Sequence, residues 1–140
     1  MEKIFRVKLL TNGWVYFNQF GNVLGIDSDN LDVQVCKNIS EYDILPETEG
    51  QFTGITDKNV VKIFENDLLS DGETIFKVEW NQQNTCWWIN PIKLLKEKQL
   101  SNEDCFITLI IGNEKLGNGY YSRKDLEVIG NIQDNSNILV

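Results

Sequence analysis

The chain has no histidine among its 140 residues, and this absence removes whole classes of chemistry. Serine and cysteine nucleophile systems in their usual forms need an imidazole as general base. HExxH metal sites and the mixed histidine and cysteine zinc sites need an imidazole as a ligand. Catalysis would therefore depend on carboxylates, lysine, tyrosine or a metal held by oxygen ligands.

Cysteine is scarce as well. The three cysteines, Cys36, Cys86 and Cys105, are widely spaced and form no CxxC pair. An odd number at such spacing fits neither a disulfide framework nor a zinc site. We therefore expect free, mostly buried thiols in a reducing compartment.

Long apolar runs are also missing. The longest, 106–111, has six residues and includes Thr108, whereas a membrane-spanning helix needs about 20 apolar residues. No continuous apolar segment of the secretory type follows Met1. Together with the free thiols, this pattern predicts a cytoplasmic protein.

Positive charge is in short supply. Lysine and arginine number 13 against 21 acidic residues, which gives a net charge of -8. Non-specific binding to nucleic acid depends on basic side chains that neutralise phosphates, so the net charge has the wrong sign for it. The same charge disfavours an anionic membrane surface, and we expect no membrane partner. A local basic patch would still permit nucleic-acid binding.

Short alternating segments separated by Gly, Asn and Asp make up most of the chain. In 74–80, Thr, Phe, Val and Trp alternate with Ile, Lys and Glu, the period of a half-buried strand. Asn12-Gly13 is a strong hairpin signal, and 37–49 is less regular and predicts a loop. The pattern predicts a mainly β protein with a single domain, 1–140, and at most one or two short helices.

The helix signal lies at Asn90-Pro91. Asparagine is a preferred N-cap residue, and proline is favoured at the first helical position. The spacing predicts a helix to about Gln99, with Ile92 and Leu95 facing inward.

Two near-motifs fail on their chemistry. Gly112 and Gly117 have the spacing of a phosphate-binding loop, but Asn118-Gly119 stands where the lysine and the serine or threonine belong. A calcium loop starting at Asp27 would have Asp32 where glycine is needed. A glycine-rich turn and an acidic turn are the better interpretations.

Aromatic residues beside cations form the candidate binding site. Such pairs stack nucleobases, and glycine-rich loops often carry binding residues. The alternative is that one tryptophan belongs to the core and the lysines form a solvated face. The candidates are Trp87, Lys93 and Lys96 around the predicted helix, and Tyr120, Tyr121 and Arg123 in the glycine-rich loop.

The acidic residues suggest no catalytic pair. Glu47 and Glu49 lie in the irregular segment, and Glu65 and Asp67 flank a turn. Solvated acidic turns explain them, although a carboxylate pair is a known arrangement for glycosidase chemistry. We assign no catalytic residue, metal ligand or cofactor.

Four stretches of the chain carry a family resemblance. They are 4–6 (IFR), 50–59 (GQFTGITDKN), 63–69 (IFENDLL) and 126–132 (LEVIGNI). In this order they resemble the signatures of YopX-like proteins, and they bracket nearly the whole chain. The glycine before the family's aspartate is Asn66 here, and asparagine tolerates left-handed backbone geometry.

The resemblance implies a β-rich fold with a barrel-like core, an origin in phages and prophages of Gram-positive bacteria, and no known catalytic residues. The signature residues predict turns: Gly54 permits a tight turn, which Asp57 and Asn59 close through side-chain bonds to the backbone. Asp67 begins a strand. The family's Asn-Gly is Asn59-Val60 here, so we expect Asn59 to take a positive φ.

The leading functional hypothesis is a phage or prophage accessory protein that binds a host or phage protein or assembles with itself. We expect a homo-oligomer, because many short strands leave edges that self-association covers. The first alternative is nucleic-acid binding, or an acidic mimic of nucleic acid that blocks a host DNA-binding protein. The second is an enzyme that uses carboxylates and an oxygen-ligated metal.

Overall fold

The computed structural model describes residues 2–28, 35–83, 85–95, 107–110, 120–122 and 125–139. Strands dominate this part of the chain, with short 3-10 helices beside them, so the mainly β prediction is confirmed. The chain divides into two compact units, Met1–Phe52 and Thr53–Val140. We call them unit 1 and unit 2 and describe each by itself.

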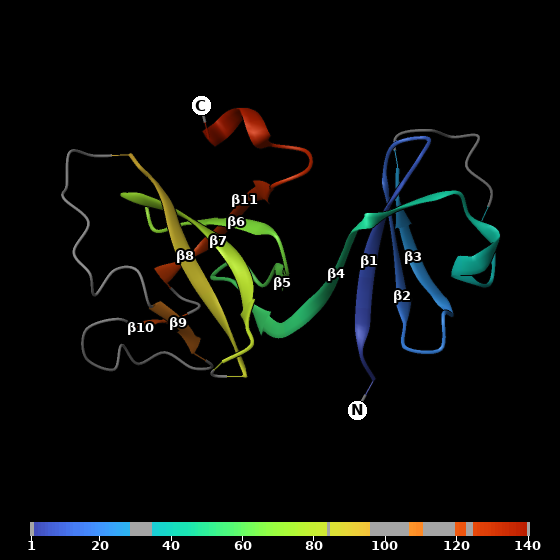
Figure 1. Ribbon diagram of the computed structural model, residues 1–140, viewed down its shortest axis with the longest axis horizontal. Coiled ribbons are helices and arrows are strands. Elements are labelled where there is room, and N and C mark those ends of the chain that lie inside the picture. The colour runs from blue at the N-terminus through green and yellow to red at the C-terminus, as the bar shows by residue number, and fades with distance from the viewer. Residues whose placement is uncertain are drawn as a thin grey trace. The chain divides into compact units, whose positions relative to one another are not determined.

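Unit 1 contains an antiparallel sheet in the order β3-β2-β1-β4 (Figure 1). Asn12 and Gly13 close the β1–β2 hairpin with φ values of 74° and 108°. Positive φ at both turn residues is the hairpin geometry that an Asn-Gly pair favours. The elements are β1 (Ile4–Leu9), β2 (Trp14–Asn18), β3 (Val23–Asp27), the 3-10 helix η1 (Ile39–Glu41) and β4 (Ile44–Thr56), which continues into unit 2.

The core of unit 1 is formed by Val7, Leu9, Val15 and Phe17. These residues alternate along β1 and β2, as one buried face of a sheet requires. Arg6 is also buried, with only 7% of its surface exposed. Its guanidinium carbon lies 4.8 Å from the centre of the Trp14 ring, a cation–π contact that compensates part of the burial.

The prediction of a loop over 37–49 is wrong, because η1 and the start of β4 lie within it. Asn38 accepts a hydrogen bond from the Ser40 backbone N–H, and the Glu41 carboxylate accepts one from the Asn38 N–H. This is a capping box, which stabilises a helix start through reciprocal side-chain bonds. The spacing of Asn38 and Glu41 was the sequence signal for it.

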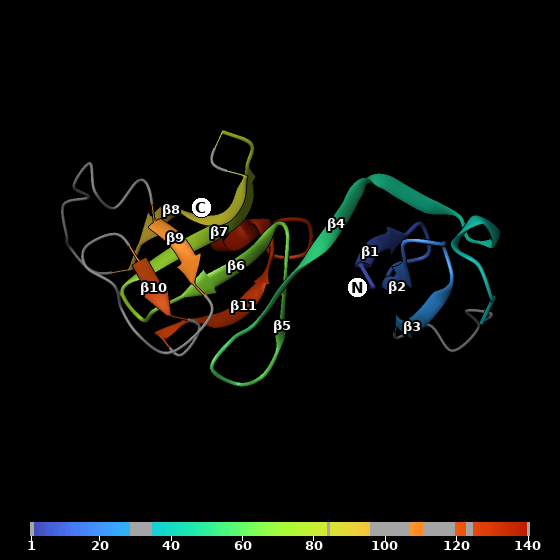
Figure 2. The ribbon, with the colours of Figure 1, turned by 90° about the horizontal axis from the view of Figure 1, so that it is seen from below.

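Unit 2 contains a sheet in the order β10-β9-β8-β7-β6-β11 (Figures 1 and 2). Neighbours are antiparallel except β9 and β10, which are parallel. β5 pairs with β4. The elements are β5 (Lys62–Phe64), β6 (Asp67–Ser70), β7 (Thr74–Asn81), β8 (Cys86–Leu94), β9 (Ile107–Ile110), β10 (Tyr120–Ser122), β11 (Glu127–Asn131) and η4 (Ser136–Leu139). The core comprises Ile55, Ile63, Leu69, Phe76, Val78, Ile89 and Leu126.

The prediction of a helix from Asn90 is wrong, because β8 runs through this segment to Leu94. β7 pairs with β8 along its whole length, and this ladder outweighs a local capping signal. Pro91 lies opposite Phe76, next to the register shift between Ile75 and Phe76. An irregularity in the ladder tolerates a residue that has no N–H to donate.

The barrel-like core that the resemblance implied is not confirmed. Among the described residues, the strand pairs form open sheets, with no pair that joins the two ends of a sheet. Barrel closure requires such a pair.

Two predictions about the signature turns are wrong. Val60, rather than Asn59, takes the positive φ, at 64°, and Gly54 has its φ of 87° inside β4 rather than in a turn. Oδ1 of Asp57 accepts hydrogen bonds from the N–H groups of both Asn59 and Val61, and this pair of bonds fixes the residue between them. The prediction for the second turn is confirmed, because Asn66 has a φ of 70°.

Replacing Val60 with glycine is expected to stabilise the protein by about 0.5–1 kcal/mol, the strain of a left-handed residue less the entropy that glycine loses on folding. The Val60 side chain is 79% exposed, so little burial is lost. Urea unfolding followed by tryptophan fluorescence measures the change. Val61→Gly is the control and is expected to destabilise, because Val61 has no positive φ to relieve. Equal effects of both substitutions would contradict the prediction.

Candidate functional site

The structure places the predicted binding residues in different environments. Trp87 packs partly buried against the unit 2 core, with its ring centre 5.1 Å from that of Trp80. Lys93 pairs with Ile75, whereas Trp87 pairs with Trp80. Positions 75 and 80 of β7 lie on opposite faces, and so do their partners.

Trp87 and Lys93 therefore do not share a face, and both belong to the strand β8 rather than to a helix. Tyr120 and Tyr121 belong to β10, where the structure describes the backbone alone. Lys96 and Arg123 lie outside the described residues, as does Cys105. A binding role for these residues stays a prediction.

Unit 1 contains an open groove of about 580 Å³, which lies within the usual size range of ligand sites. No local sequence pattern marks this groove, because its lining residues come from four separate segments. They are Lys3, Phe5, Phe17, Asn18, Gln19, Phe20, Gly21, Asn38, Ile39 and Glu49.

Two phenylalanines form the apolar part of the groove. Phe5 of β1 and Phe17 of β2 are cross-strand partners, and their rings stack with centres 5.6 Å apart and planes at 21°. Stacked aromatic pairs across a sheet stabilise the strand pairing and hold the rings in one orientation. The groove therefore has a rigid aromatic surface.

The turn after β2 places a third phenylalanine beside this surface. Oδ1 of Asn18 accepts hydrogen bonds from the N–H groups of Phe20 at 3.0 Å and Asn22 at 2.9 Å. Gly21 supplies the φ of 81° that the tight turn requires. As a result Phe20 is 74% exposed although its backbone is held in place.

Three residues with side-chain amides line the groove, and the oxygen of each amide accepts a backbone N–H. Besides Asn18, Gln19 accepts from the Lys3 N–H at 2.9 Å and Asn38 accepts from the Ser40 N–H at 3.0 Å. Only the amide oxygen can accept from an N–H, so these bonds fix which way each amide points. Within the described residues, none of the three amide NH₂ groups donates a hydrogen bond.

The charged residues of the groove balance each other. Lys3 and Glu49 are both exposed, and neither forms an ion pair with any residue that the structure describes. The lining is therefore neutral overall. Residues 1–52 contain four basic and eight acidic residues, so unit 1 as a whole has a net charge of -4.

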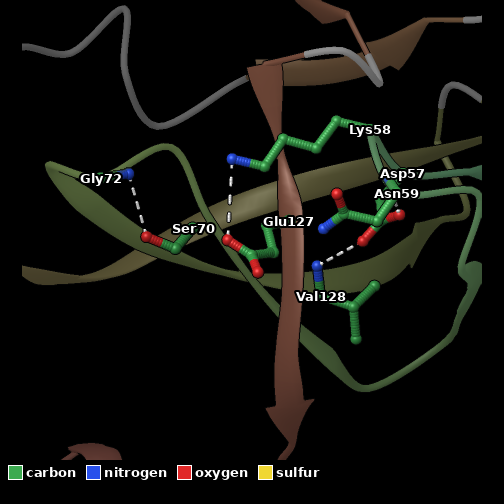
Figure 3. A network of polar contacts seen from close by, with 7 residues as sticks. All are labelled: Asp57, Lys58, Asn59, Ser70, Gly72, Glu127 and Val128. Carbon is green, nitrogen blue, oxygen red and sulfur yellow. Dashed lines mark hydrogen bonds and ion pairs between the residues drawn. The ribbon is translucent and has the colours of Figure 1, made fainter.

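The buried carboxylates of unit 2 hold the backbone together, and Figure 3 shows the first of them, Asp57. Asp57 is 3% exposed; besides its two bonds within the turn, its Oδ2 accepts from the Val128 N–H of β11 at 2.8 Å. Lys58 and Glu127, the neighbours of Asp57 and Val128, form an ion pair at 3.6 Å. We call this contact between the signature turn and β11 the junction. Asp67 is 2% exposed, and its Oδ2 accepts from the Phe64 N–H at 2.7 Å.

Other features of the described residues add no reactive centre. Neither Cys36 nor Cys86 forms a disulfide with a residue that the structure describes, and both are partly exposed rather than buried. Desolvation raises the pKa of Tyr42 above its ordinary value, although a hydrogen bond from the Cys36 N–H lowers it. Within the same residues, no group of three or more Cys, Asp or Glu side chains is arranged to hold a metal, and no helix has the length and apolarity to span a membrane.

Comparison with known families decides the relationship. A family model described as "YopX protein" matches residues 5–140. The chain belongs to the YopX family. The match confirms the resemblance of the four stretches and extends over both units. No curated protein matches the chain significantly.

Of the groove residues that the structure describes, only Phe5 belongs to the YopX signature, in its 4–6 stretch. Most of the 50–69 signature, together with 126–132, builds the junction of unit 2 around Asp57 and Asp67. The groove is lined by residues 3–49 of unit 1. Apart from Phe5, the residues by which the family is recognised therefore build the fold, and the groove is the candidate for binding.

Proposed function

We propose that this YopX protein is a non-catalytic accessory protein of a phage or prophage, and that it binds a partner protein in the groove of unit 1. One observation carries the proposal: Phe20 is 74% exposed on a turn that is fixed by two Asn18 hydrogen bonds. A large aromatic side chain held in water beside other apolar groups is typical of a binding anchor.

The use of the buried carboxylates supports the non-catalytic part of the proposal. Asp57 and Asp67 are the acidic residues with the least exposure in the described part of the chain. Their oxygens accept backbone N–H groups, which makes them structural supports rather than groups facing a substrate. An enzyme built on carboxylates and a metal is therefore the less favoured alternative.

Charge favours a protein over a nucleic acid as the partner. Binding to nucleic acid gains its affinity from several lysine or arginine contacts to phosphates. The groove offers Lys3 as its one lysine, which Glu49 offsets. A nucleic-acid mimic that acts on a host protein remains compatible with the net charge of -8.

Self-association is a further part of the proposal. Among the strands that the structure describes, β3 lies at the edge of the unit 1 sheet, where the Val23 N–H already donates to the Lys37 carbonyl and Leu24 is 49% exposed. Pairing with a second copy would satisfy the edge and cover this side chain. Size-exclusion chromatography with light scattering is expected to give at least a dimer, and a monomer at all concentrations would exclude this part.

Phe20→Ser tests the binding proposal. The tagged full-length protein and the variant are used to capture proteins from a lysate of the bacterial host, with and without nuclease. We expect at least one protein that the parent retains in both conditions and that the variant loses at least ten-fold. Thermal unfolding serves as the control for folding and is expected to change little, because Phe20 is mostly exposed. An identical set of captured proteins for both would contradict the proposal.

A further inference from the structure

We infer that the groove takes an uncharged, extended peptide segment with a large apolar side chain. The inference rests on the proposed function and names the chemistry of the partner. The apolar side chain would lie against the phenylalanines, and the peptide carbonyl groups would accept hydrogen bonds from the groove amides.

The side-chain amides of the groove favour a ligand that supplies hydrogen-bond acceptors. Asn18, Gln19 and Asn38 all line the groove, and each uses the side-chain oxygen to accept a backbone N–H. Their NH₂ groups donate to no residue that the structure describes, so they are donors for a ligand. A ligand that meets these groups has to supply acceptors. Peptide carbonyls are strong acceptors that repeat along an extended chain.

The phenylalanines of the groove favour a ligand with a large apolar side chain. Phe5 and Phe17 are fixed by stacking, and Phe20 stands exposed beside them on its hydrogen-bonded turn. Prearranged aromatic groups bind with little loss of conformational entropy. They favour a ligand that brings a large aliphatic or aromatic side chain.

The charge and the hydrogen-bonding groups of the groove disfavour competing ligands. Lys3 and Glu49 cancel within the lining, so the groove does not select a phosphate or another strongly charged group. Sugar hydroxyls need acceptors as well as donors. The groove offers few acceptors: the Asn18 oxygen already accepts two hydrogen bonds, those of Gln19 and Asn38 accept one each, and Glu49 is the one carboxylate among the lining residues. In a peptide, the backbone N–H groups would meet this carboxylate.

The test screens the full-length protein against a displayed library of uncharged nine-residue peptides. An enriched peptide is then synthesised with a fluorophore, and its Kd is measured by fluorescence anisotropy. We expect enrichment of peptides with Phe, Tyr, Leu or Ile. We also expect Phe20→Ala to weaken binding at least ten-fold.

A pair of isosteric substitutions tests the donor role. Gln19→Glu with Asn38→Asp keeps an oxygen for the Lys3 and Ser40 N–H groups and removes two NH₂ donors. The matched control is Asn59→Asp with Gln82→Glu in unit 2, which adds the same charge and keeps an acceptor for the Trp80 indole N–H. We expect a loss of at least ten-fold for the first pair and less than two-fold for the control.

Three results would overturn the inference. The first is enrichment of no peptide, or of peptides that bind the Phe20→Ala variant equally well. The second is equal weakening by the groove pair and its control. The third is binding of a fluorescent oligothymidine, but of no peptide, that depends on Phe20. If capture from the lysate depends on Phe20 while the peptide screen fails, the proposed function stands and the ligand class is wrong.

Discussion

Replacing Asp57 with alanine is expected to lower the free energy of unfolding by about 3 kcal/mol, because several buried or partly buried N–H groups lose their acceptor at once. The three donors are the backbone N–H groups of Asn59, Val61 and Val128, at 2.8, 2.9 and 2.8 Å. The bond to Val128 spans 71 residues of sequence and connects the signature turn with β11. Urea unfolding of the full-length protein, followed by tryptophan fluorescence, gives the value.

Asp71→Ala is the matched control for this prediction. Oδ1 of Asp71 accepts from the N–H groups of Glu73 and Thr74 in the turn between β6 and β7, where the surroundings are more exposed. Water replaces an acceptor more easily there, and we expect a loss of about 1 kcal/mol. A cost for Asp57→Ala no larger than that of Asp71→Ala would show that the carboxylate does not hold the junction.

Gly130→Ala is expected to destabilise the protein by about 3 kcal/mol, through a strained backbone and a steric clash together. Gly130 has a φ of 154° at the register shift of β11. A Cβ atom there would collide with the side-chain amide of Asn135. That amide cannot move away without loss, because its Oδ1 accepts from the Asn131 N–H at 3.1 Å.

Gly54→Ala separates the two contributions. Gly54 also has a positive φ, of 87°, but an added Cβ would meet no atom within 4 Å. Its substitution is expected to cost only the backbone term, about 1 kcal/mol. Unfolding in urea measures both variants, and equal losses would mean that the contact with Asn135 contributes nothing.

Most residues of the family signature are expected to affect the stability of the fold rather than binding. Substitutions at Asp57 and Gly130 act on the free energy of folding through backbone hydrogen bonds and close packing. Substitution of Phe20 acts on an exposed surface and leaves the core unchanged. Loss of partner capture without loss of stability is therefore the specific result expected for the groove.

Local sequence patterns predicted a large part of the fold. The Asn12-Gly13 hairpin, the strand over 74–80 and the start of a strand at Asp67 depend on neighbouring residues, and the structure has all of them. The helix at Asn90 failed although its local signal was good. Its residues find hydrogen-bond partners in β7, which the capping pattern does not contain.

The candidate binding residues also show that local sequence patterns do not predict contacts between distant parts of the chain. Trp87 and Lys93 lie close in sequence but on opposite faces of a sheet. The groove residues Lys3, Phe17 and Asn38 lie far apart in sequence and meet only when β1 pairs with β2 and the Asn38 turn closes beside them. Short-range patterns cannot reveal a site of this kind.

The sequence by itself determined the β class, the YopX relationship and the exclusion of histidine chemistry, because these depend on composition and on motifs that are contiguous. The tertiary structure alone decided that 90–94 is a strand, that Val60 takes the left-handed conformation, and that the side-chain oxygens of Asn18 and Asn38 accept backbone N–H groups. Each of these outcomes depends on hydrogen bonds that form only after the chain has folded. The physical reason is that a backbone or amide group takes the partner that the fold brings to it, and the local sequence does not name that partner.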